Sequence, residues 1–419
     1  MNKKLNGILK AFSSASMAMA LIAGAQTPVP PMPAATAAAT APVAAATAAP
    51  AATDAPAAAP IVPPTPPTWS VGPIDISGFI DGYYSYNTNR PTDAANGQMN
   101  DLYNFNDKTD MFNLSAAKLT LNHDPDPIGA HVDFIYGRTN DLINAVPANS
   151  SSADQLNYIE QAFLSLKPIK AKGFELDFGK FVTSAGAEVI ESKDNWNYSR
   201  SLLFSWAIPY WHFGARASMP VSKTDTIGLQ LVNGWNNVSK SNGGVTVGLN
   251  NALTKPKYAW NLNYYGGPEN ANTTSGFRNL IDTTILLTPT AKFNAYINYD
   301  YGQNRDGKVT TGSITTGDTN LNHWQGVAVA ARGQVTGKAA FAGRYEYYLD
   351  PNGFMTGTAQ HLQEFTGTYQ YKWVEGLLAR AEYRGDFSNV SSFHQNSTSF
   401  TNKQSTFTLG MVAFFGPKR

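Results

Sequence analysis

Between residues 291 and 301 the chain reads Ala-Lys-Phe-Asn-Ala-Tyr-Ile-Asn-Tyr-Asp-Tyr, and apolar or aromatic residues alternate with other residues from Phe293 onward. Residues 258 to 264, which read Tyr-Ala-Trp-Asn-Leu-Asn-Tyr, repeat the pattern. Because side chains of a β-strand point alternately to opposite faces, each segment predicts a strand with one apolar and one polar face. The pattern recurs from about Trp69 to the C-terminus without a composition break, which predicts one large all-β domain.

The composition excludes several classes of protein. Charged residues make up 15% of the chain and aromatic residues 12%, and no stretch approaches the roughly 18 uninterrupted apolar residues of a membrane-spanning helix. A transmembrane barrel stays possible, because its strands need only about 10 alternating residues. The absence of cysteine excludes disulfides, thiolate zinc sites and cysteine nucleophiles. A formal net charge of +1 gives no indication of nucleic-acid binding.

The N-terminal part predicts an exported protein. Lys3 and Lys4 precede a weakly apolar run over residues 11–22 and the small triplet Ala23-Gly-Ala25, so we expect a signal peptide over residues 1–25. Residues 26–68 are almost entirely Pro, Ala and Thr, with Asp54 as their only charge. Such a segment cannot bury a core and predicts a disordered periplasmic linker, either an inert spacer or a contact to the cell wall. The remaining domain covers residues 69–419.

Alternation alone identifies fifteen candidate strands, whereas single-chain barrels of bacterial outer membranes have even numbers of strands. These candidates are residues 74–86, 112–122, 128–137, 158–167, 174–182, 209–219, 226–235, 257–265, 279–287, 291–301, 323–332, 338–349, 361–371, 377–387 and 403–415.

The lengths of the connections indicate where a strand is missing. Short connections (123–127, 167–173 and 220–225) alternate with long ones (87–111, 138–157 and 183–208), as periplasmic turns and outer loops do. The tight turn 288–290 breaks this order unless residues 245–252, which also alternate, form another strand. The sequence therefore predicts a 16-stranded antiparallel transmembrane β-barrel, within a range of 14 to 18, with both termini in the periplasm.

The predicted outward faces are apolar. One carries Trp211, Phe213, Ala215, Ala217 and Met219, and aromatic residues gather at strand ends, as in the interfacial girdles of outer-membrane barrels. The alternative is a soluble β-sandwich, in which strands also alternate. A sandwich does not call for one-sided long loops, so we expect the barrel.

Several motifs resemble the outer-membrane β-barrel porins of the porin-2 type. The resemblance covers about residues 74–419, but the distinctive motifs lie mostly between residues 158 and 240. These motifs are Gly179-Lys-Phe181, Ser184-Ala-Gly-Ala-Glu188, Tyr198-Ser-Arg-Ser-Leu202, Gly214-Ala-Arg216 and Asn233-Gly-Trp-Asn236. The resemblance implies an outer-membrane channel. One departure is the end of the chain: many outer-membrane barrels finish on an aromatic residue, whereas Gly416-Pro-Lys-Arg419 follows Phe415 here. It bears on how the barrel-assembly machinery reads this end.

Charged residues on the polar faces are expected to line the lumen, because a Lys or Arg at the bilayer midplane costs about 2–4 kcal/mol. In general porins the third outer loop folds into the channel, and by that resemblance residues 183–208 would narrow this pore. We hypothesise that loop acids face wall arginines across a constriction and so set ion preference. The candidate pore-lining residues are Glu188, Glu191 and Asp194 of the loop, Arg216, Arg344, Arg380 and Arg384, and Asp81, Asp133, Glu175 and Asp177 of the early strands.

Two other interpretations of these polar residues stay open. Arg344 with Glu346, and the run Arg380-x-Glu382-x-Arg384-x-Asp386, place acids beside bases on single faces, so neighbouring strands could neutralise them without any transverse field. Inward asparagines and tyrosines, such as Asn294 and Tyr296, could bind a passing sugar or be ordinary polar lining.

The sequence predicts an outer-membrane porin that passes small hydrophilic solutes or ions by diffusion, with no cofactor, metal or catalytic residue. Its six histidines are scattered, and no Gly-x-Ser-x-Gly or phosphate-binding motif occurs, so an outer-membrane lipase or protease is disfavoured. Expected partners are outer-membrane lipid and the assembly machinery. The sequence leaves a monomer and a homotrimer open, and only the analogy with general porins, which are often trimers, favours the homotrimer. The alternative function is a barrel plugged by its loops that anchors the envelope through the N-terminal linker.

Overall fold

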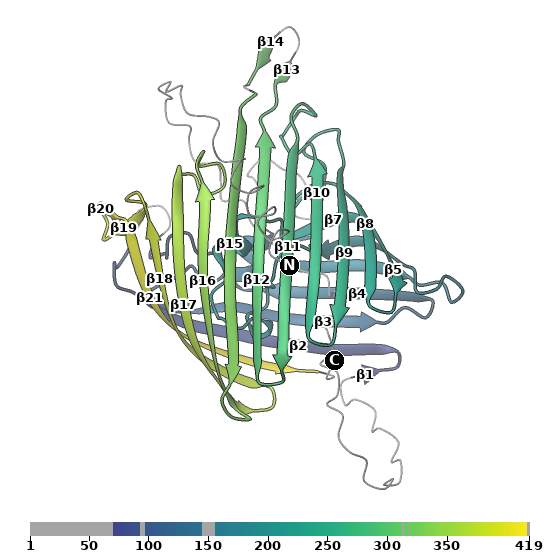
Figure 1. The fold of residues 1–419 in the computed structure, drawn as a ribbon, viewed down its shortest axis with the longest axis horizontal. Coiled ribbons are helices and arrows are strands. Elements are labelled where there is room, and N and C mark those ends of the chain that lie inside the picture. Colours follow the sequence, from purple (N-terminus) through teal and green to yellow (C-terminus); the bar gives the residue numbers. More distant parts are fainter. Residues whose placement is uncertain (1–69, 93–96, 145–155, 312–313, 318, 417–419) are drawn as a thin grey trace, which may run out of the picture. The chain divides into compact units, whose positions relative to one another are not determined.

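The computed structural model describes residues 70–92, 97–144, 156–311, 314–317 and 319–416 (Figure 1). Within them, sixteen antiparallel strands pair in sequence order and close into a barrel where the last strand pairs with the first. The strands are β2 (Ile74–Asn87), β3 (Met111–His123), β4 (Ile128–Tyr136), β5 (Ile159–Leu166), β6 (Glu175–Val182), β7 (Trp211–Ser222), β8 (Asp225–Val232), β9 (Thr246–Lys255), β10 (Tyr258–Gly267), β11 (Arg278–Thr290), β12 (Phe293–Arg305), β15 (Leu321–Gln334), β16 (Ala339–Asp350), β17 (Gln360–Val374), β18 (Leu377–Ser388) and β21 (Lys403–Phe415).

The structure confirms the strand that connection lengths predicted. β9 occupies residues 246–255 and pairs with β8 on one side and β10 on the other. At the closing seam Gly78 of β2 lies opposite Phe415 of β21, so the start of the first strand and the end of the last meet at one end of the barrel. The predicted signal peptide and linker lie outside the described residues.

Smaller elements occupy the connections, where alternation predicts nothing. A two-residue strand, β1 (Ser70–Val71), folds back on the start of β2. The long loops contain two hairpins and three short helices: β13 (Val309–Thr311) with β14 (Ile314–Thr316), β19 (Phe393–Gln395) with β20 (Ser399–Thr401), α2 (Arg138–Ile143), η1 (Ser192–Asp194) and α3 (Leu202–Trp206). Among the described residues, no helix has the length and apolar character needed to cross a membrane.

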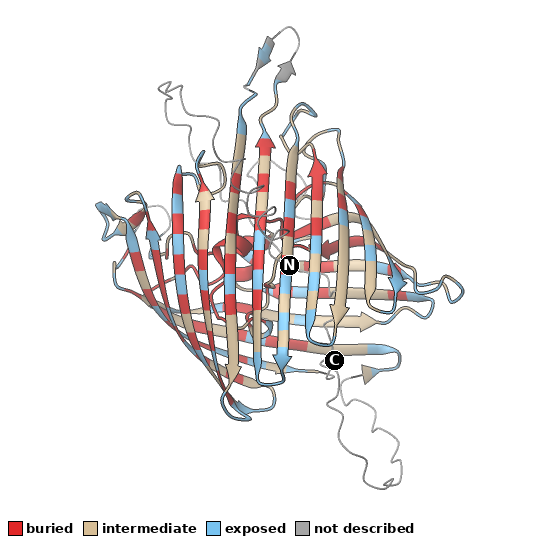
Figure 2. Cartoon of the chain, viewed as in Figure 1, coloured by how far each residue is buried: buried red, intermediate tan, exposed pale blue. Residues whose placement is uncertain are grey.

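The burial of β21 shows which face of the sheet points outward. Phe407, Leu409 and Met411 are 52%, 63% and 54% exposed, whereas Thr406 and Thr408 between them are 1% and 3% exposed. This distribution is the reverse of that in a soluble protein, in which the apolar face of the sheet would be buried. Figure 2 shows the same alternation of buried and exposed positions along many strands. The soluble sandwich is therefore wrong, and the apolar face is the lipid-facing wall of a barrel.

One predicted strand ends early for a local reason. The pattern of residues 226–235 predicts a strand, but β8 stops at Val232. Gly234 has φ 122° and Asn236 has φ 52°, which belong to a turn and not to extended backbone. The Asn233 side chain donates to the carbonyl of Val238 and holds this turn, so the apolar Trp235 lies in a loop.

Candidate functional site

The connection between β6 and β7, residues 183–208, lies inside the barrel. Its backbone and side chains reach strands far from its own: Ser184 contacts Tyr265 of β10, Ala187 contacts Asn298 of β12, and the carbonyl of Ala207 accepts from Trp324 of β15. We call these residues the inner loop. Wall strands β10, β12 and β15 therefore all hold this one segment.

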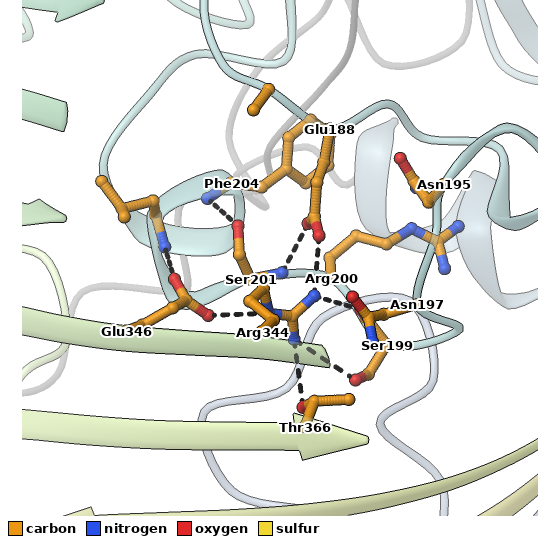
Figure 3. A network of polar contacts seen from close by, with 12 residues as sticks. Glu188, Asn195, Asn197, Ser199, Arg200, Ser201, Phe204, Arg344, Glu346 and Thr366 are labelled. Carbon is orange, nitrogen blue, oxygen red and sulfur yellow. Dashed lines mark hydrogen bonds and ion pairs between the residues drawn. The ribbon is translucent and has the colours of Figure 1, made fainter. Parts of the chain in front are cut away.

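Arg344 of β16 is the central contact between the wall and the inner loop (Figure 3). Its Nη1 lies 2.7 Å from Glu188 Oε1, and its Nε lies 3.0 Å from Glu364 Oε2 and 3.2 Å from Glu346 Oε1. The same Nη1 donates to the carbonyl of Ser199 at 2.8 Å. Arg344 and Glu188 are 1% and 3% exposed, so they form a direct buried ion pair, not two charges separated by a gap.

Wall carboxylates accept hydrogen bonds from the backbone of the inner loop. Glu346 accepts from the amides of Leu202 and Leu203, at 2.9 and 3.0 Å, where helix α3 begins. These amides have no partner within the helix, and a negative charge there is favourable. Glu382 of β18 accepts in the same way from the amides of Tyr198 and Ser199, at 2.5 and 2.8 Å.

Asp81 of β2 binds side chains of the inner loop. Its two oxygens accept from Ser192 Oγ and from Tyr198 Oη, both at 2.7 Å. Burial raises the pKa of the Tyr198 phenol well above its usual value, and the nearby Asp81 carboxylate adds to this effect. Tyr198 therefore stays a hydrogen-bond donor to Asp81.

Wall arginines bind carbonyl groups of the inner loop. Arg380 donates to the carbonyls of Ser192 and Asn195, the latter at 2.6 Å. Arg384 donates to the carbonyl of Arg200 at 2.7 Å and forms an ion pair with Asp386, also at 2.7 Å. The ion pair between Arg384 and Asp386 is one of the acid–base pairs along a single face that the sequence pattern left open. Both guanidiniums donate to carbonyls of buried loop residues, so these polar backbone groups are hydrogen-bonded away from water.

On the other side of the seam between β2 and β21, Lys118 of β3 contacts three acids. Its Nζ lies 2.9 Å from Asp133 Oδ2 and 2.7 Å from Glu160 Oε2, and it also contacts Glu191 of the inner loop. Burial by itself would raise the pKa of the Glu191 carboxyl, but the Lys118 ammonium beside it holds that pKa below its usual value. Glu191 therefore anchors the loop as a carboxylate.

The remaining predicted residues lie apart from the inner loop's anchors. Arg216 of β7 pairs with Asp177 of β6 at 2.7 Å, and its guanidinium lies over the ring of Phe181. Glu175 pairs with Lys167 at 2.8 Å near the short turns. Asp194 pairs with its neighbour Lys193 at 2.6 Å. Its side chain is largely exposed and is therefore in contact with water.

Sequence reasoning missed an aromatic cluster between the inner loop and the first long loop, residues 88–110. Phe105 lies 5.8 Å from Phe204 and 5.2 Å from Tyr210, measured between ring centroids, and all three are buried. Trp206 Nε1 donates to the carbonyl of Leu102. The available signal was the run Leu202-Leu-Phe-Ser-Trp206 after Ser201, whose Oγ caps helix α3 by accepting from the amide of Phe204.

Burial distinguishes two parts of the inner wall. On β2, β18 and β21 the central inward positions are all buried, among them Asp81, Tyr83 and Ser85 of β2 and Thr406, Thr408 and Val412 of β21. On β3 to β10 many inward positions stay partly exposed, and examples are Lys118, His131, Phe163, Arg216, Ser218, Asn250 and Asn261. The first part is therefore covered by loops, and the second borders solvent.

Comparisons with known proteins agree with this architecture. The family described as "Putative beta-barrel porin-2, OmpL-like" matches residues 73–415. No curated protein matches the chain. Within the described residues, no three His, Cys, Asp or Glu side chains group as metal ligands would.

Solved structures share the fold at low sequence identity. OmpT of Vibrio cholerae and the outer membrane channel DcaP of Acinetobacter baumannii each have a TM-score of 0.52 and 12% identity, over 82% of this chain and 97% of theirs. An anion-selective porin from Comamonas acidovorans has the same TM-score and identity, over 82% and 99%. The family match, which spans the barrel, decides the function. The chain belongs to the porin-2 family of β-barrel porins and is a bacterial outer-membrane channel for passive diffusion.

Proposed function

We propose that small hydrophilic solutes and ions cross this porin between the inner loop and the wall formed by β3 to β10. The observation that carries the proposal is the unequal exposure of the inner wall, because partly exposed inward side chains such as Arg216 and Asn250 need adjacent water. The polar character of this wall suits hydrated solutes and requires no catalytic turnover.

The same exposure suggests which charges determine ion preference. Glu191, Lys193 and Asp194 on the loop and Arg216 and Glu175 on the wall keep contact with water. The wall acids Asp133 and Asp177 are buried, at 1% and 6% exposed, and pair with Lys118 and Arg216. Asp81, Glu188, Arg344, Arg380 and Arg384 are at most 4% exposed, and in this proposal they hold the constriction in place instead of facing the permeating ion.

Planar-bilayer recordings test this division. Lys193→Glu and Arg216→Glu should each move the reversal potential in a KCl gradient toward cation preference, because each replaces a water-accessible cation by an anion. Lys338→Glu makes the same charge change in the exposed turn between β15 and β16, outside the strands of the wall, and should leave the potential unchanged. Unchanged potentials in both lumen variants would contradict the assignment.

A second candidate function is a plugged barrel that anchors the envelope through residues 26–68. The aromatic cluster around Phe105 and Phe204 favours it, because this cluster fills lumen space with a packed core. A plugged barrel should give no conductance steps in a bilayer, whereas a diffusion channel should give them. The presence of regular steps in the wild-type protein would exclude the plugged barrel.

We also propose a homotrimer with both chain termini in the periplasm, produced with a cleaved signal peptide over residues 1–25. Two observations support it: the first and last strands meet at one end of the barrel, and a structure of Vibrio cholerae OmpT, with a TM-score of 0.51, is described as a trimer form. Native mass measurement in detergent should give three times the mass of one chain. Trypsin added to intact cells should leave an N-terminal tag placed after residue 25 uncut.

A further inference from the structure

Four arginines of the lumen wall between β15 and β18 differ in how fully they are bound. Arg344, Arg380 and Arg384 are saturated by carboxylates or by carbonyls of the inner loop. Arg332 of β15 donates only to Gln334 Oε1, at 3.1 Å, and no carboxylate of the described residues lies within 4.0 Å of its guanidinium. Arg332 is also partly exposed. One cation of this wall is therefore left for a ligand.

The strand register places hydrogen-bonding and aromatic groups beside Arg332. Asn294 of β12 lies directly opposite Arg332, and Tyr296 faces the same side two residues further along, at about 7 Å. The ring of Trp196, from the inner loop, packs on Tyr296 with 5.1 Å between centroids. Trp196 is partly exposed, and its indole N–H has no hydrogen-bond partner among the described residues.

These groups match one class of solute. A guanidinium binds a carboxylate with two parallel hydrogen bonds, which an ammonium or an amide cannot do. The Asn294 amide can donate to and accept from hydroxyl groups, and the face of an indole ring accepts a sugar ring through apolar contact. We propose that Arg332, Asn294 and Trp196 form a binding site for carboxylates that carry a sugar ring, at the short-turn end of the lumen.

This site deepens the proposed function, on which it rests, by naming a solute class for it. Arg332 and Asn294 are partly exposed and lie on β15 and β12, which follow β10 and β11 around the lumen wall. Binding should slow the solute and so reduce the ion current while it is bound. Three probes separate the contributions: glucuronate has the ring and the carboxylate, gluconate has the carboxylate on an open chain, and glucose has the ring without the charge.

The test is the concentration of each probe that halves the single-channel KCl current, with the probe added to either side of the bilayer. Glucuronate should act at the lowest concentration, and Arg332→Gln should raise that concentration about tenfold. Lys338→Gln removes the same charge from the neighbouring turn and should leave it unchanged. Trp196→Ala should bring glucuronate and gluconate to equal values, and Asn294→Asp should weaken both acids while leaving glucose unaffected.

The outcomes are separable from failure of the channel itself. Absence of conductance steps in the wild-type protein would overturn the proposed function. Normal steps with equal glucuronate block in Arg332→Gln and Lys338→Gln would overturn the site alone. Heat-modifiable gel mobility of each variant confirms that the barrel has formed before it is recorded.

Discussion

At the scale of single residues, buried charged side chains of the barrel wall hold the backbone of the inner loop in place. Arg344 lies among Glu188, Glu346 and Glu364, and its neighbours bind loop amides that water cannot reach. Such an arrangement is costly to form, but it is far more costly to break on one side. These contacts therefore explain why the inner loop has one defined path through the lumen.

Arg344→Ala tests this view. It leaves three carboxylates buried without their cation, so we expect a loss of about 3–5 kcal/mol of stability and unfolding of the barrel at a lower temperature in the heat-modifiability assay. Lys338→Ala, an exposed turn residue, serves as the control. An Arg344→Ala barrel that unfolds at the wild-type temperature would contradict the role of Arg344 as a structural cation.

At the scale of elements, the inner loop and helix α3 behave as one docked unit. Five residues of helix cannot be stable alone, so α3 depends on its cap at Ser201 and on Glu346 at its first amides. Tyr198 and Ser199 depend in the same way on Glu382. Loss of both wall acids should free the loop without opening the sheet.

The double variant Glu346→Ala, Glu382→Ala should therefore become sensitive to trypsin at Lys193 and Arg200 while the barrel stays folded. Four buried amides lose their acceptors, which favours an exposed loop. Glu175→Ala removes a partly exposed acid whose partner Lys167 stays in water, so cleavage should stay at the wild-type level. Protection of both sites in the double variant would mean that the aromatic cluster alone holds the loop.

At the scale of the whole molecule, the outer face of the sheet contacts lipid and the inner face contacts water or buried loop residues. Leu409 lies at the middle of β21 on the lipid-facing side, and Asn250 of β9 lies on the lumen side where it is partly exposed. Leu409→Lys should cost about 2–4 kcal/mol and reduce the folded fraction in membranes, whereas Asn250→Lys should be tolerated. Folded fractions measured by gel mobility after refolding into lipid vesicles would decide, and equal tolerance would refute the assignment of faces.

The strands of the barrel wall could be predicted from the sequence. A strand with lipid on one face and water on the other must alternate apolar and polar residues, and this alternation is visible in single segments such as residues 291–301. Connection lengths then located β9, which alternation alone left out. Neither signal describes the path of a loop. The contacts of Arg380 with carbonyls of residues 192 and 195, and of Glu382 with amides of residues 198 and 199, join backbone groups that every residue has. Such partners have no sequence signature, so the sequence alone could not show that Arg380 and Glu382 bind the inner loop.

The seam between β2 and β21 has a consequence for biogenesis. Asn87 hydrogen-bonds to Gln404, which lies 317 residues later, and the pairing of the two strands needs the last residues of the chain. Until that pairing forms, both strands present open edges that can join other chains. Contacts of such sequence separation form late and slowly. A chain shortened within β21 should therefore leave the first strand unpaired and accumulate as an aggregate, even though its other fifteen strands are intact.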